Sequence, residues 1–345
     1  MLVLGGSLHH RGGIESFCER TLEAVSRHGS GWRATWWTTD NAYLSWNRLG
    51  AAARAWKRLG TLNRHSVDLV WLQWSTLADL ILLRRVVALG FPVMATPHLG
   101  ANARLQRVPF LRAICTRLVA KADRLALLFD EQASEIALPD MPRSILGTFL
   151  PEDTLATPVP TRAAGPIRLL HAGRLSREKG TFRMVAICAM LHAKGIPFSA
   201  RIVGRAEPDV VTGIETAIAD AGLKQSVELA GWMDGPALRE ALGQTDVLVH
   251  LSELDSFPLI VLEALAAGAL PIVSDMAGAA SMVRHYDGLI TPDSSVEMAA
   301  DWLMKMDPEA IRERGEKASL LVRADHAWPD MVAKLERVAD ISVKN

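Results

Sequence analysis

Two carboxylates, Asp255 and Glu263, stand eight positions apart in the stretch ELDSFPLIVLEALAAGALPIV at residues 253–273. Glu263 is the only polar side chain among the seventeen residues 257–273, so it lies in a strongly apolar segment. An ionised carboxylate in such surroundings costs roughly several kcal/mol unless it is paired and hydrogen-bonded. Glu263 therefore needs a partner, which is either a neighbouring Lys or Arg or a pair of hydroxyl groups on a ligand.

The residues around these acids predict a buried helix that is apolar on every side. Ser256 is suited to cap its start, Pro258 to an early position in it, and Gly268 to the position just after its end. Asp255 would then precede the helix, at the positive end of its dipole, where a negative charge is favourable even without a ligand.

Basic residues gather in HAGRLSREKGTF at 171–182. An apolar segment ends at Gly173, and Arg174 and Lys179 follow it before Gly180 and a helical pattern. A planar guanidinium and a compact ammonium group together suit a diphosphate. Ordinary surface charges are the alternative.

Two further stretches follow predicted strands. In GGSLHHRGGIES at 5–16, Gly12 and Gly13 lead into a helical pattern, where bare amides can face a phosphate or a sugar. A tight strand-to-helix turn would have the same sequence. In PVMATPHLG at 92–100, His98 follows an apolar strand, which is compatible with a ligand contact and with a structural role.

Short apolar segments alternate with helical patterns along the whole chain. Segments that are apolar on both faces and joined by helices indicate doubly wound parallel sheets, in which ligands bind beyond the carboxyl ends of the strands. All four stretches above lie at such ends. Strands are expected at 1–4, 32–39, 67–74, 91–97 and 124–129, and again at 167–173, 198–204, 227–232, 247–252, 270–275 and 288–292.

The alternation is interrupted once, by the segment 151–166, which carries four prolines and reads as a linker. The chain therefore divides into a Rossmann-like domain at 1–150 and a second one at 167–325, with a cleft between them. Residues 326–345 form a helical end, and packing on the N-terminal domain is one arrangement open to it. With 345 residues, 49% of them apolar, the chain can build two cores.

Charge is distributed unevenly although the formal net charge is zero. Residues 1–150 carry a net charge of +7, and within 41–122 twelve basic residues face only Asp68 and Asp79. A basic half indicates an anionic partner, unless it is simply a solvated face. The acid-free segment 43–65 resembles a basic amphipathic helix, with Trp46, Leu49, Ala53, Trp56 and Leu59 near one face. A membrane-proximal acceptor would explain this face, and a helix packed on its own sheet would explain it equally well.

Three widely spaced cysteines, Cys18, Cys115 and Cys188, argue against disulfides and against a structural zinc. No grouping has the spacing of a metal site, so we expect no metal and no cofactor. The start MLVLGG lacks the pattern of a signal peptide, and no apolar run is long enough to span a bilayer. We expect a cytoplasmic protein. No nucleic-acid motif accompanies the basic half, so no nucleic-acid partner is expected.

Taken together, these stretches resemble the retaining glycosyltransferases of family 4, which have the GT-B architecture of two Rossmann-like domains. The element GRLSREKG and the segment DSFPLIVLEALAAG, followed by LPIVSDMAG, are similar to that family's signatures. In the first half, GGIES resembles its glycine-rich loop, and TPH stands where a strand-end histidine is usual.

The resemblance implies a role for each matching residue. Arg174 and Lys179 would hold the diphosphate of a nucleotide-sugar donor, Glu263 the ribose hydroxyls and Asp255 hydroxyls of the sugar. The side chain of His98 would lie by the anomeric carbon. The remaining donor contacts would come from Gly13, Phe257, Pro258 with its neighbour Leu259, and Trp232 beside the base.

Three departures from the family pattern concern the sugar and the acceptor. Asp255 stands where a longer glutamate is usual, Ser281 takes another glutamate's place, and Trp71 and Gln73 replace a pair of histidines. These changes leave the expected nucleotide contacts intact.

The resemblance implies a hexosyl-type transferase that uses a UDP- or GDP-sugar, retains the anomeric configuration and needs no metal. Its acceptor would be a hydroxyl of a glycan or a lipid-linked molecule, with peripheral contact to an anionic membrane at its inner face, as in polysaccharide biosynthesis. A nucleotide-sugar epimerase, a phosphorylase-like enzyme and a non-catalytic sugar-binding subunit are the alternatives.

Overall fold

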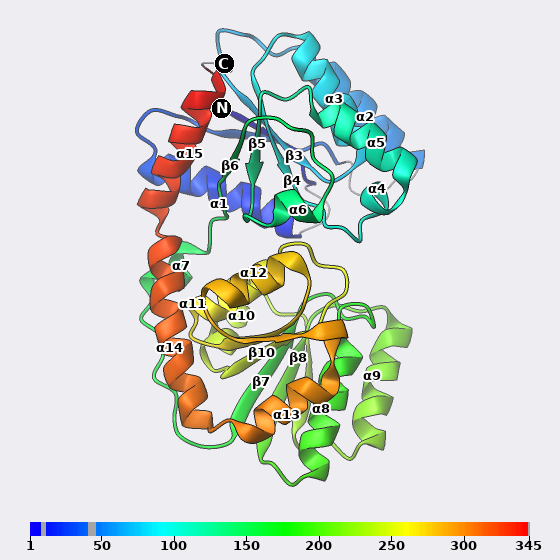
Figure 1. Ribbon diagram of the computed structural model, residues 1–345, viewed down its shortest axis with the longest axis vertical. Coiled ribbons are helices and arrows are strands. Elements are labelled where there is room, and N and C mark those ends of the chain that lie inside the picture. The colour runs from blue at the N-terminus through cyan, green and yellow to red at the C-terminus, as the bar shows by residue number, and fades with distance from the viewer. Residues whose placement is uncertain (8–11, 41–45, 344–345) are drawn as a thin grey trace. The chain divides into compact units, whose positions relative to one another are not determined.

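The computed structural model describes residues 1–7, 12–40 and 46–343, and the side chains of all of these except 46–49 (Figure 1). The chain forms two compact units. Unit 1 comprises residues 1–149 and 326–345, and unit 2 comprises residues 150–325. The segment 326–345 is thus part of unit 1.

Unit 1 contains a six-stranded sheet in the order β2-β1-β3-β4-β5-β6, and all neighbouring strands are parallel. The strand order reverses between β1 and β3, which is where doubly wound sheets bind ligands. The strands are β1 Leu2–Leu4, β2 Thr35–Trp37, β3 Val70–Trp74, β4 Val93–Pro97, β5 Arg124–Leu127 and β6 Arg143–Ile145.

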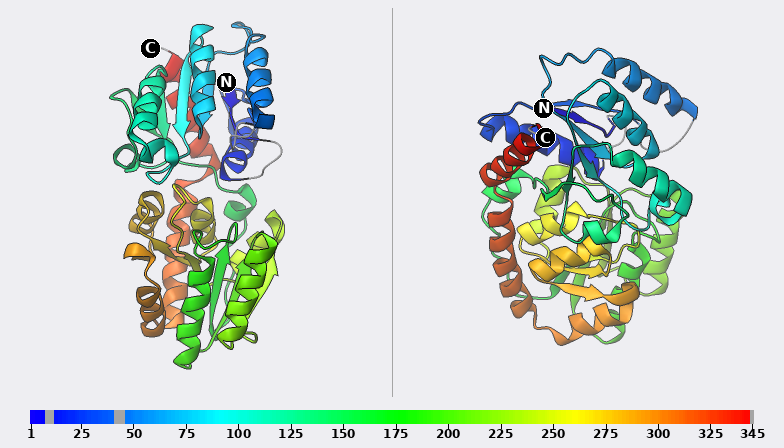
Figure 2. Two further views of the ribbon diagram at one scale, coloured as in Figure 1. Left: turned by 90° about the vertical axis from the view of Figure 1, so that its right-hand side faces the viewer. Right: turned by 45° about the horizontal axis from the view of Figure 1, so that its top comes forward.

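Helices cover both faces of this sheet. Helix α3 packs against both α2 and α5 in one layer, whereas α15 packs against α1 (Figures 1 and 2). The helices are α1 Gly13–His28, α2 Trp46–Leu59, α3 Leu77–Ala88, α4 Arg104–Arg107, α5 Pro109–Val119, α6 Gln132–Glu135 and α15 Trp328–Val343. Helix α15 is also tied to the segment after α1, because Glu336 accepts hydrogen bonds from the amides of residues 30–32.

Unit 2 repeats this plan with a parallel sheet in the order β12-β11-β10-β7-β8-β9. Its strand order reverses between β7 and β10. The strands are β7 Ile167–Ala172, β8 Phe198–Val203, β9 Val227–Gly231, β10 Val247–His250, β11 Leu270–Ser274 and β12 Leu289–Thr291.

Helix α8 lies between α9 and α13, whereas α11 packs against α10, α12 and α14 (Figures 1 and 2). The helices are α7 Glu152–Ala156, α8 Thr181–Ala193, α9 Pro208–Asp220, α10 Gly235–Gly243, α11 Leu259–Ala266, α12 Ala277–His285, α13 Val296–Lys305 and α14 Pro308–Asp325, with a 3₁₀ turn at Pro292–Ser294.

The predicted class of two doubly wound parallel α/β units is confirmed, and each of the eleven expected strands is present. Three local predictions were wrong. The strand β6 was missed, and the segment expected as a linker begins with helix α7. The expected apolar face of α2 is also split, because Leu59 is buried whereas Ala53 and Trp56 are exposed. The side chains of Trp46 and Leu49 lie outside the described part of the chain.

Within the described residues, no helix combines the length and the apolar character needed to cross a bilayer.

Candidate functional site

The polar residues of unit 2 meet at the carboxyl ends of β7 and β10, the switch point of its sheet. Lys179 Nζ forms an ion pair and hydrogen bond with Asp255 Oδ1. His250, the last residue of β10, donates from Nε2 to the other oxygen, Asp255 Oδ2, at 2.9 Å. The strand pattern predicted that Lys179 and Asp255 lie at the same edge of the sheet. In the structure their side chains form a direct ion pair.

These two partners determine the charge of Asp255. Burial alone would raise the pKa of this carboxyl group, but the hydrogen bond from His250 and the positive charge of Lys179 outweigh burial and hold the pKa well below its usual range. Asp255 is therefore ionised at neutral pH.

A buried histidine shapes the segment that carries Lys179. His171, on β7, donates from Nδ1 to the carbonyl oxygen of Val249 at 3.0 Å and accepts at Nε2 from Thr181 Oγ1 at 3.0 Å. Thr181 in turn accepts from the amide of Ser176. Burial lowers the pKa of His171 to about 4, so the ring is neutral and its tautomer is fixed.

Gly180 completes this arrangement. Its φ of +84° is in the left-handed region, and a Cβ atom there would collide with the carbonyl oxygen of Leu251. The segment after β7 therefore lies directly against the segment after β10, and only glycine fits between them.

Two other residues of unit 2 that were predicted to contact the donor, Arg174 and Trp232, also follow strands of this sheet. The side chain of Arg174 is exposed, just after β7. Trp232 follows β9 and is 58% exposed, and the guanidinium of Arg205 lies 4.5 Å from its ring centroid. This cation–π contact joins the segments that follow β8 and β9, at the carboxyl edge of the sheet.

Helix α11 begins later than predicted, because Ser256 was expected as its cap and Pro258 as one of its early residues. It begins at Leu259 with Pro258 at the N-cap, and Ser256 Oγ has no hydrogen-bond partner among the described residues. Gly268 follows its end at φ +84°, as predicted. The helix is not buried all round, because Glu263 and Leu259 are half-buried, as is Phe257 before it.

A second cluster lies at the corresponding edge of unit 1. His98, just after β4, donates from Nε2 to Gln73 Oε1 on β3 at 2.8 Å, and its ring meets Phe17 edge to face. Burial lowers the pKa of His98 to about 3, so this ring is also neutral at pH 7. Gln73 Nε2 is buried without a hydrogen-bond partner among the described residues.

The loop before α1 is held by an acid that the sequence did not single out. Gly12 is the N-cap and Gly13 the first residue of α1, and Glu15 two residues on is 7% exposed. Its Oε1 accepts from the amide of Ser7 at 2.8 Å. Glu15 is the third residue of the helix, a position from which an acidic side chain can accept hydrogen bonds from the amides that precede the helix. Its place three residues after Gly12 was the feature of the sequence that could have identified it.

His171 and His250 were missed as well. Each ends, or nearly ends, a largely apolar strand, in RLLH and VLVH. Gln73, in WLQW, was noted only as a departure from the family pattern. A polar residue in that place was the only signal in the sequence, and it does not reveal the partner across the sheet.

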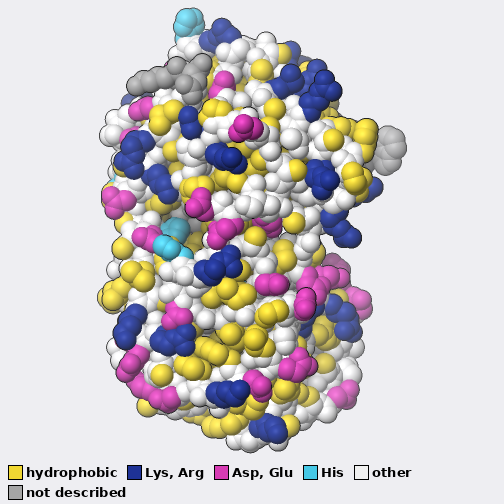
Figure 3. Space-filling view, viewed as in Figure 1, with side chains coloured by type: hydrophobic (Ala, Val, Ile, Leu, Met, Phe, Trp, Pro, Cys, Tyr) yellow, Lys and Arg dark blue, Asp and Glu magenta, His cyan; other side chains and the backbone are white. Residues whose placement is uncertain are grey.

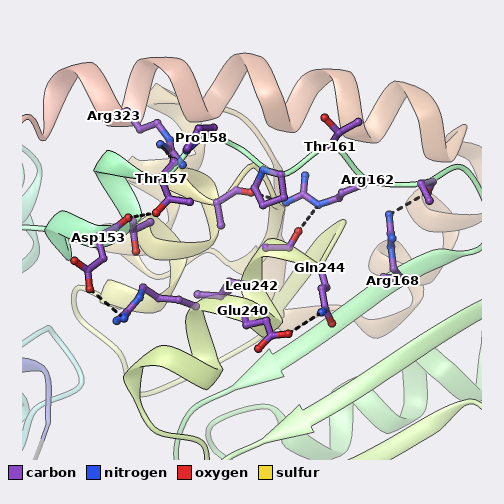
Figure 4. A pocket seen from close by; sticks show the side chains of 16 residues that line it. Asp153, Thr157, Pro158, Thr161, Arg162, Arg168, Glu240, Leu242, Gln244 and Arg323 are labelled. Carbon is purple, nitrogen blue, oxygen red and sulfur yellow. Dashed lines mark hydrogen bonds and ion pairs between the residues drawn. The ribbon is translucent and has the colours of Figure 1, made fainter.

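A cavity of about 400 Å³ lies elsewhere in unit 2, between residues 153–163, α10 and the end of α11 (Figure 4). Two of its arginines are bound to helix ends. Arg162 donates to the carbonyl oxygens of Gly243, Ala267 and Gly268, and Arg323 donates to that of Ala266. These guanidinium groups stabilise the carboxyl ends of α10 and α11, and none of the predicted site residues lines the cavity.

Residues 157–317 match the family model described as Glycosyl transferases group 1. The amylovoran biosynthesis glycosyltransferase AmsK of Erwinia amylovora is 26% identical over 148 residues, which are 41% of this chain and 36% of that protein. The GDP-mannose:cellobiosyl-diphosphopolyprenol alpha-mannosyltransferase of Xanthomonas oryzae is 25% identical over 169 residues, 48% of this chain and 44% of that protein. The matches thus span less than half the length of these relatives.

Solved structures are similar over the whole chain. Anabaena Alr3699/HepE in complex with UDP and glucose has a TM-score of 0.74 at 14% identity, covering 98% of this chain and 99% of that one. Sucrose-phosphate synthase from Thermosynechococcus elongatus has a TM-score of 0.76 at 18% identity, covering 98% and 97%. The resemblance to group 1 glycosyl transferases and the GT-B fold are therefore confirmed. The roles of the individual site residues, and family 4 in particular, stay predictions.

Proposed function

We propose that this chain, whose residues 157–317 match the glycosyl transferases group 1, is a hexosyl-type transferase that uses a nucleotide-diphosphate sugar. The observation that carries the proposal is the meeting of Lys179, Asp255 and His250 at the switch point of unit 2. Ligands of doubly wound sheets bind at such points. An ammonium group beside a carboxylate there offers one group for a diphosphate and one for sugar hydroxyls.

The donor would extend along the carboxyl edge of unit 2. Arg174 and Lys179 bind its diphosphate, Glu263 its ribose hydroxyls, and the base stacks near Trp232. Phe257, Pro258 and Leu259, which lead into α11, bring backbone groups close to the sugar. The exposure of Arg174 and Trp232 and the half-buried position of Glu263 support these roles.

The chemical step would depend on fixed positive charge rather than on a metal. The sugar becomes oxocarbenium-like as the diphosphate leaves, and Arg174 and Lys179 stabilise the charge on the leaving group. A phosphate oxygen of that group takes the proton of the acceptor hydroxyl on the same face, so the anomeric configuration is retained. Because His98 is neutral, it acts near the anomeric carbon as a hydrogen-bonding group rather than as a cation. Gly13 supplies an amide at the start of α1.

The donor base is uridine or guanosine, by analogy with named relatives. The Anabaena structure contains UDP, and the Xanthomonas relative is named for GDP-mannose. That relative is also named for a diphosphopolyprenol acceptor, which supports a lipid-linked or glycan acceptor in polysaccharide biosynthesis. The layer of α2, α3 and α5 is rich in exposed arginines and apolar groups (Figure 3), which supports contact with an anionic membrane at its cytoplasmic face.

The test begins with a thermal-shift screen over UDP- and GDP-sugars, because a ligand of the native state raises its melting temperature. Arg174→Ala should then lower kcat/KM for the bound donor by about 100-fold, in line with the loss of a charged contact to a leaving group. Arg201→Ala is the matched control, since this arginine pairs with Glu228 on the exposed surface.

Three results would contradict the proposal. Unchanged turnover in Arg174→Ala would remove the diphosphate assignment. Conversion of the donor sugar without any acceptor would indicate an epimerase. Donor binding with neither transfer nor hydrolysis over a broad acceptor panel would indicate a non-catalytic subunit.

A further inference from the structure

His98 is fixed to strand β3 through both its backbone and its ring. Its amide donates to the carbonyl oxygen of Trp74 at 2.7 Å, and its ring nitrogen Nε2 lies 2.8 Å from Oε1 of Gln73. The ring also packs edge to face on Phe17, with 5.3 Å between the ring centroids. The orientation of the imidazole is therefore set by its protein neighbours before any ligand binds.

Gln73 in turn has little freedom to move away from this ring. It is 1% exposed, and a Cβ atom on Gly5 would stand 2.8 Å from both Cβ and the carbonyl oxygen of Gln73, so the end of β1 lies directly against it. An amide oxygen only accepts hydrogen bonds, so the ring must carry its proton on Nε2. Burial lowers the pKa of His98 to about 3, and a neutral imidazole has a single N–H. The other nitrogen, Nδ1, is therefore a bare acceptor.

Nδ1 is the nitrogen of His98 that is left for a ligand. It has no hydrogen-bond partner among the described residues and is not one of the buried side-chain atoms that lack one, and His98 as a whole is half-buried. Ionised phosphate and carboxylate groups have no proton to donate to a bare nitrogen. A hydroxyl group does, and a sugar carries several.

Packing alone does not explain an amide at position 73. The other four residues of β3 are buried and apolar or aromatic. Nε2 of Gln73 is buried without a hydrogen-bond partner in the part of the chain that the structure describes. A buried donor without a partner lowers stability, so an apolar residue would suit the core better. What the amide contributes is the acceptor for His98.

We propose that Gln73 is a positioning residue that holds the proton of His98 on Nε2, so that Nδ1 accepts a hydrogen bond from a hydroxyl group of the donor sugar. This inference rests on the proposed function and adds to it the direction of one hydrogen bond. A sugar that lacks this hydroxyl, or that carries an ionised acid in its place, binds more weakly because it cannot donate to the ring.

The first measurement is nitrogen-15 NMR of the histidine rings in the protein without ligand, because protonated and bare ring nitrogens give distinct signals. The signals of His98 are those that disappear in His98→Gln. We expect the Nε2–H tautomer for His98 in the unmodified protein. Gln73→Met keeps the length of the side chain but removes the acceptor, so the share of this tautomer should fall.

The second measurement is calorimetric affinity for analogues of UDP-glucose and GDP-mannose, in which each sugar hydroxyl is replaced in turn by hydrogen or by fluorine. Fluorine accepts a weak hydrogen bond but cannot donate one. At one position both replacements should lower the affinity by about 2- to 10-fold, the range for one neutral hydrogen bond. This loss should be absent in His98→Ala and smaller in Gln73→Met.

Gln106→Met is the matched control. Gln106, on α4, is 5% exposed, and its Oε1 accepts from the amide of Ala137 at 2.9 Å. Its Nε2 is also buried without a partner among the described residues. The control should lose stability because the Ala137 amide loses its acceptor, while the tautomer of His98 and the affinities for the analogues stay unchanged. A change in Gln73→Met alone thus separates positioning from a general loss of packing.

Three results overturn the inference while leaving the proposed function standing. One is the Nδ1–H tautomer of His98 in the unmodified protein, which needs no variant of Gln73 to fold. Another is full affinity for the fluorine analogue where the hydrogen analogue binds weakly, because the hydroxyl would then be an acceptor. The third is the absence of any position at which the loss depends on His98. Failure of every nucleotide sugar to bind overturns the proposed function, whereas the tautomer, measured without ligand, still tests the role of Gln73.

Discussion

The carboxylate of Asp255 is bound by two side chains, Lys179 and His250, and the sequence analysis singled out only Lys179 of the two. Arg174, Lys179 and Asp255 could be predicted because each follows an apolar strand at a ligand-binding edge. The ion pair between Lys179 and Asp255 could not be predicted. It depends on β7 and β10 being neighbours in the sheet, and the strand order is not evident from the sequence. His250 escaped notice for a similar reason, since a single polar residue at a strand end is usually structural.

Asp255→Asn should destabilise unit 2 in a pH-dependent way. The pKa of Asp255 is lowered in the folded state, so its contribution is present above its unfolded pKa of about 3.9 and is lost as the pH falls through the folded pKa. At pH 7 the free energy of unfolding should fall by roughly 1–3 kcal/mol. The difference between variant and unmodified protein should shrink at acidic pH.

Urea denaturation at about pH 7 and about pH 3 checks this expectation. Glu228→Gln is the control, because Glu228 forms an exposed pair with Arg201 and should change stability little at either pH. An equal effect of Asp255→Asn at both pH values would show that the ionised carboxylate is not what stabilises the site.

At the level of secondary structure, prediction succeeded where strands are rich in apolar residues. Such strands leave a clear pattern, and they include the edge strand β2 at Thr35–Trp37, which has no buried residue. The missed strand, β6, is a three-residue edge strand, Arg-Ser-Ile, with a single apolar residue. The start of α11 was misplaced because Ser256 and Pro258 both suit a helix start. In the structure Pro258 is the N-cap, with extended backbone, and the helix begins at Leu259.

Gly180→Ala tests whether the close approach of the segments after β7 and β10 positions Lys179. The added Cβ would meet the carbonyl oxygen of Leu251, so the segment must move, and we expect at least a tenfold loss of donor affinity. Gly195→Ala is the matched control, because Gly195 also has a positive φ, of +68°, but nothing lies within 4 Å of its Cβ position.

Both variants should lose roughly 1 kcal/mol of stability from the left-handed backbone alone. Only Gly180→Ala should lose donor binding, as measured by calorimetry. Equal donor affinity in the two variants would show that the approach to Leu251 does not matter for binding.

On the scale of the whole chain, positive charge and exposed apolar groups occur on the same helices of unit 1. On α2, α3, α4 and α5 the described residues include one acid, Asp79, which is 2% exposed and caps α3 with Thr76. Trp56, Ile81 and Phe110 are exposed on these helices by 41%, 49% and 72%. The sequence predicted the basic segment but left open whether its apolar face, which includes Trp56, packs on the sheet or faces outward.

We expect unit 1 to bind anionic vesicles through these helices, and Phe110→Ser to weaken that binding. Basic residues near an anionic surface each contribute about 1 kcal/mol, and an inserted aromatic side chain adds to this. Co-sedimentation at low and high salt is the measurement. Leu320→Ser, which changes a 68% exposed residue of α14 in unit 2, is the control. Absence of binding at low salt would remove the membrane proposal.

The grouping of α15 with unit 1 has a consequence for how the chain folds during synthesis. Unit 2 is one continuous segment, 150–325, and can fold as soon as it has left the ribosome. Unit 1 begins first but needs Glu336 to bind the amides at 30–32 and Trp328 to fill its core, so it is completed only after unit 2 has been made. The incomplete first unit must therefore wait with part of its apolar surface uncovered, which makes this interval the one in which a nascent chain would most need a chaperone.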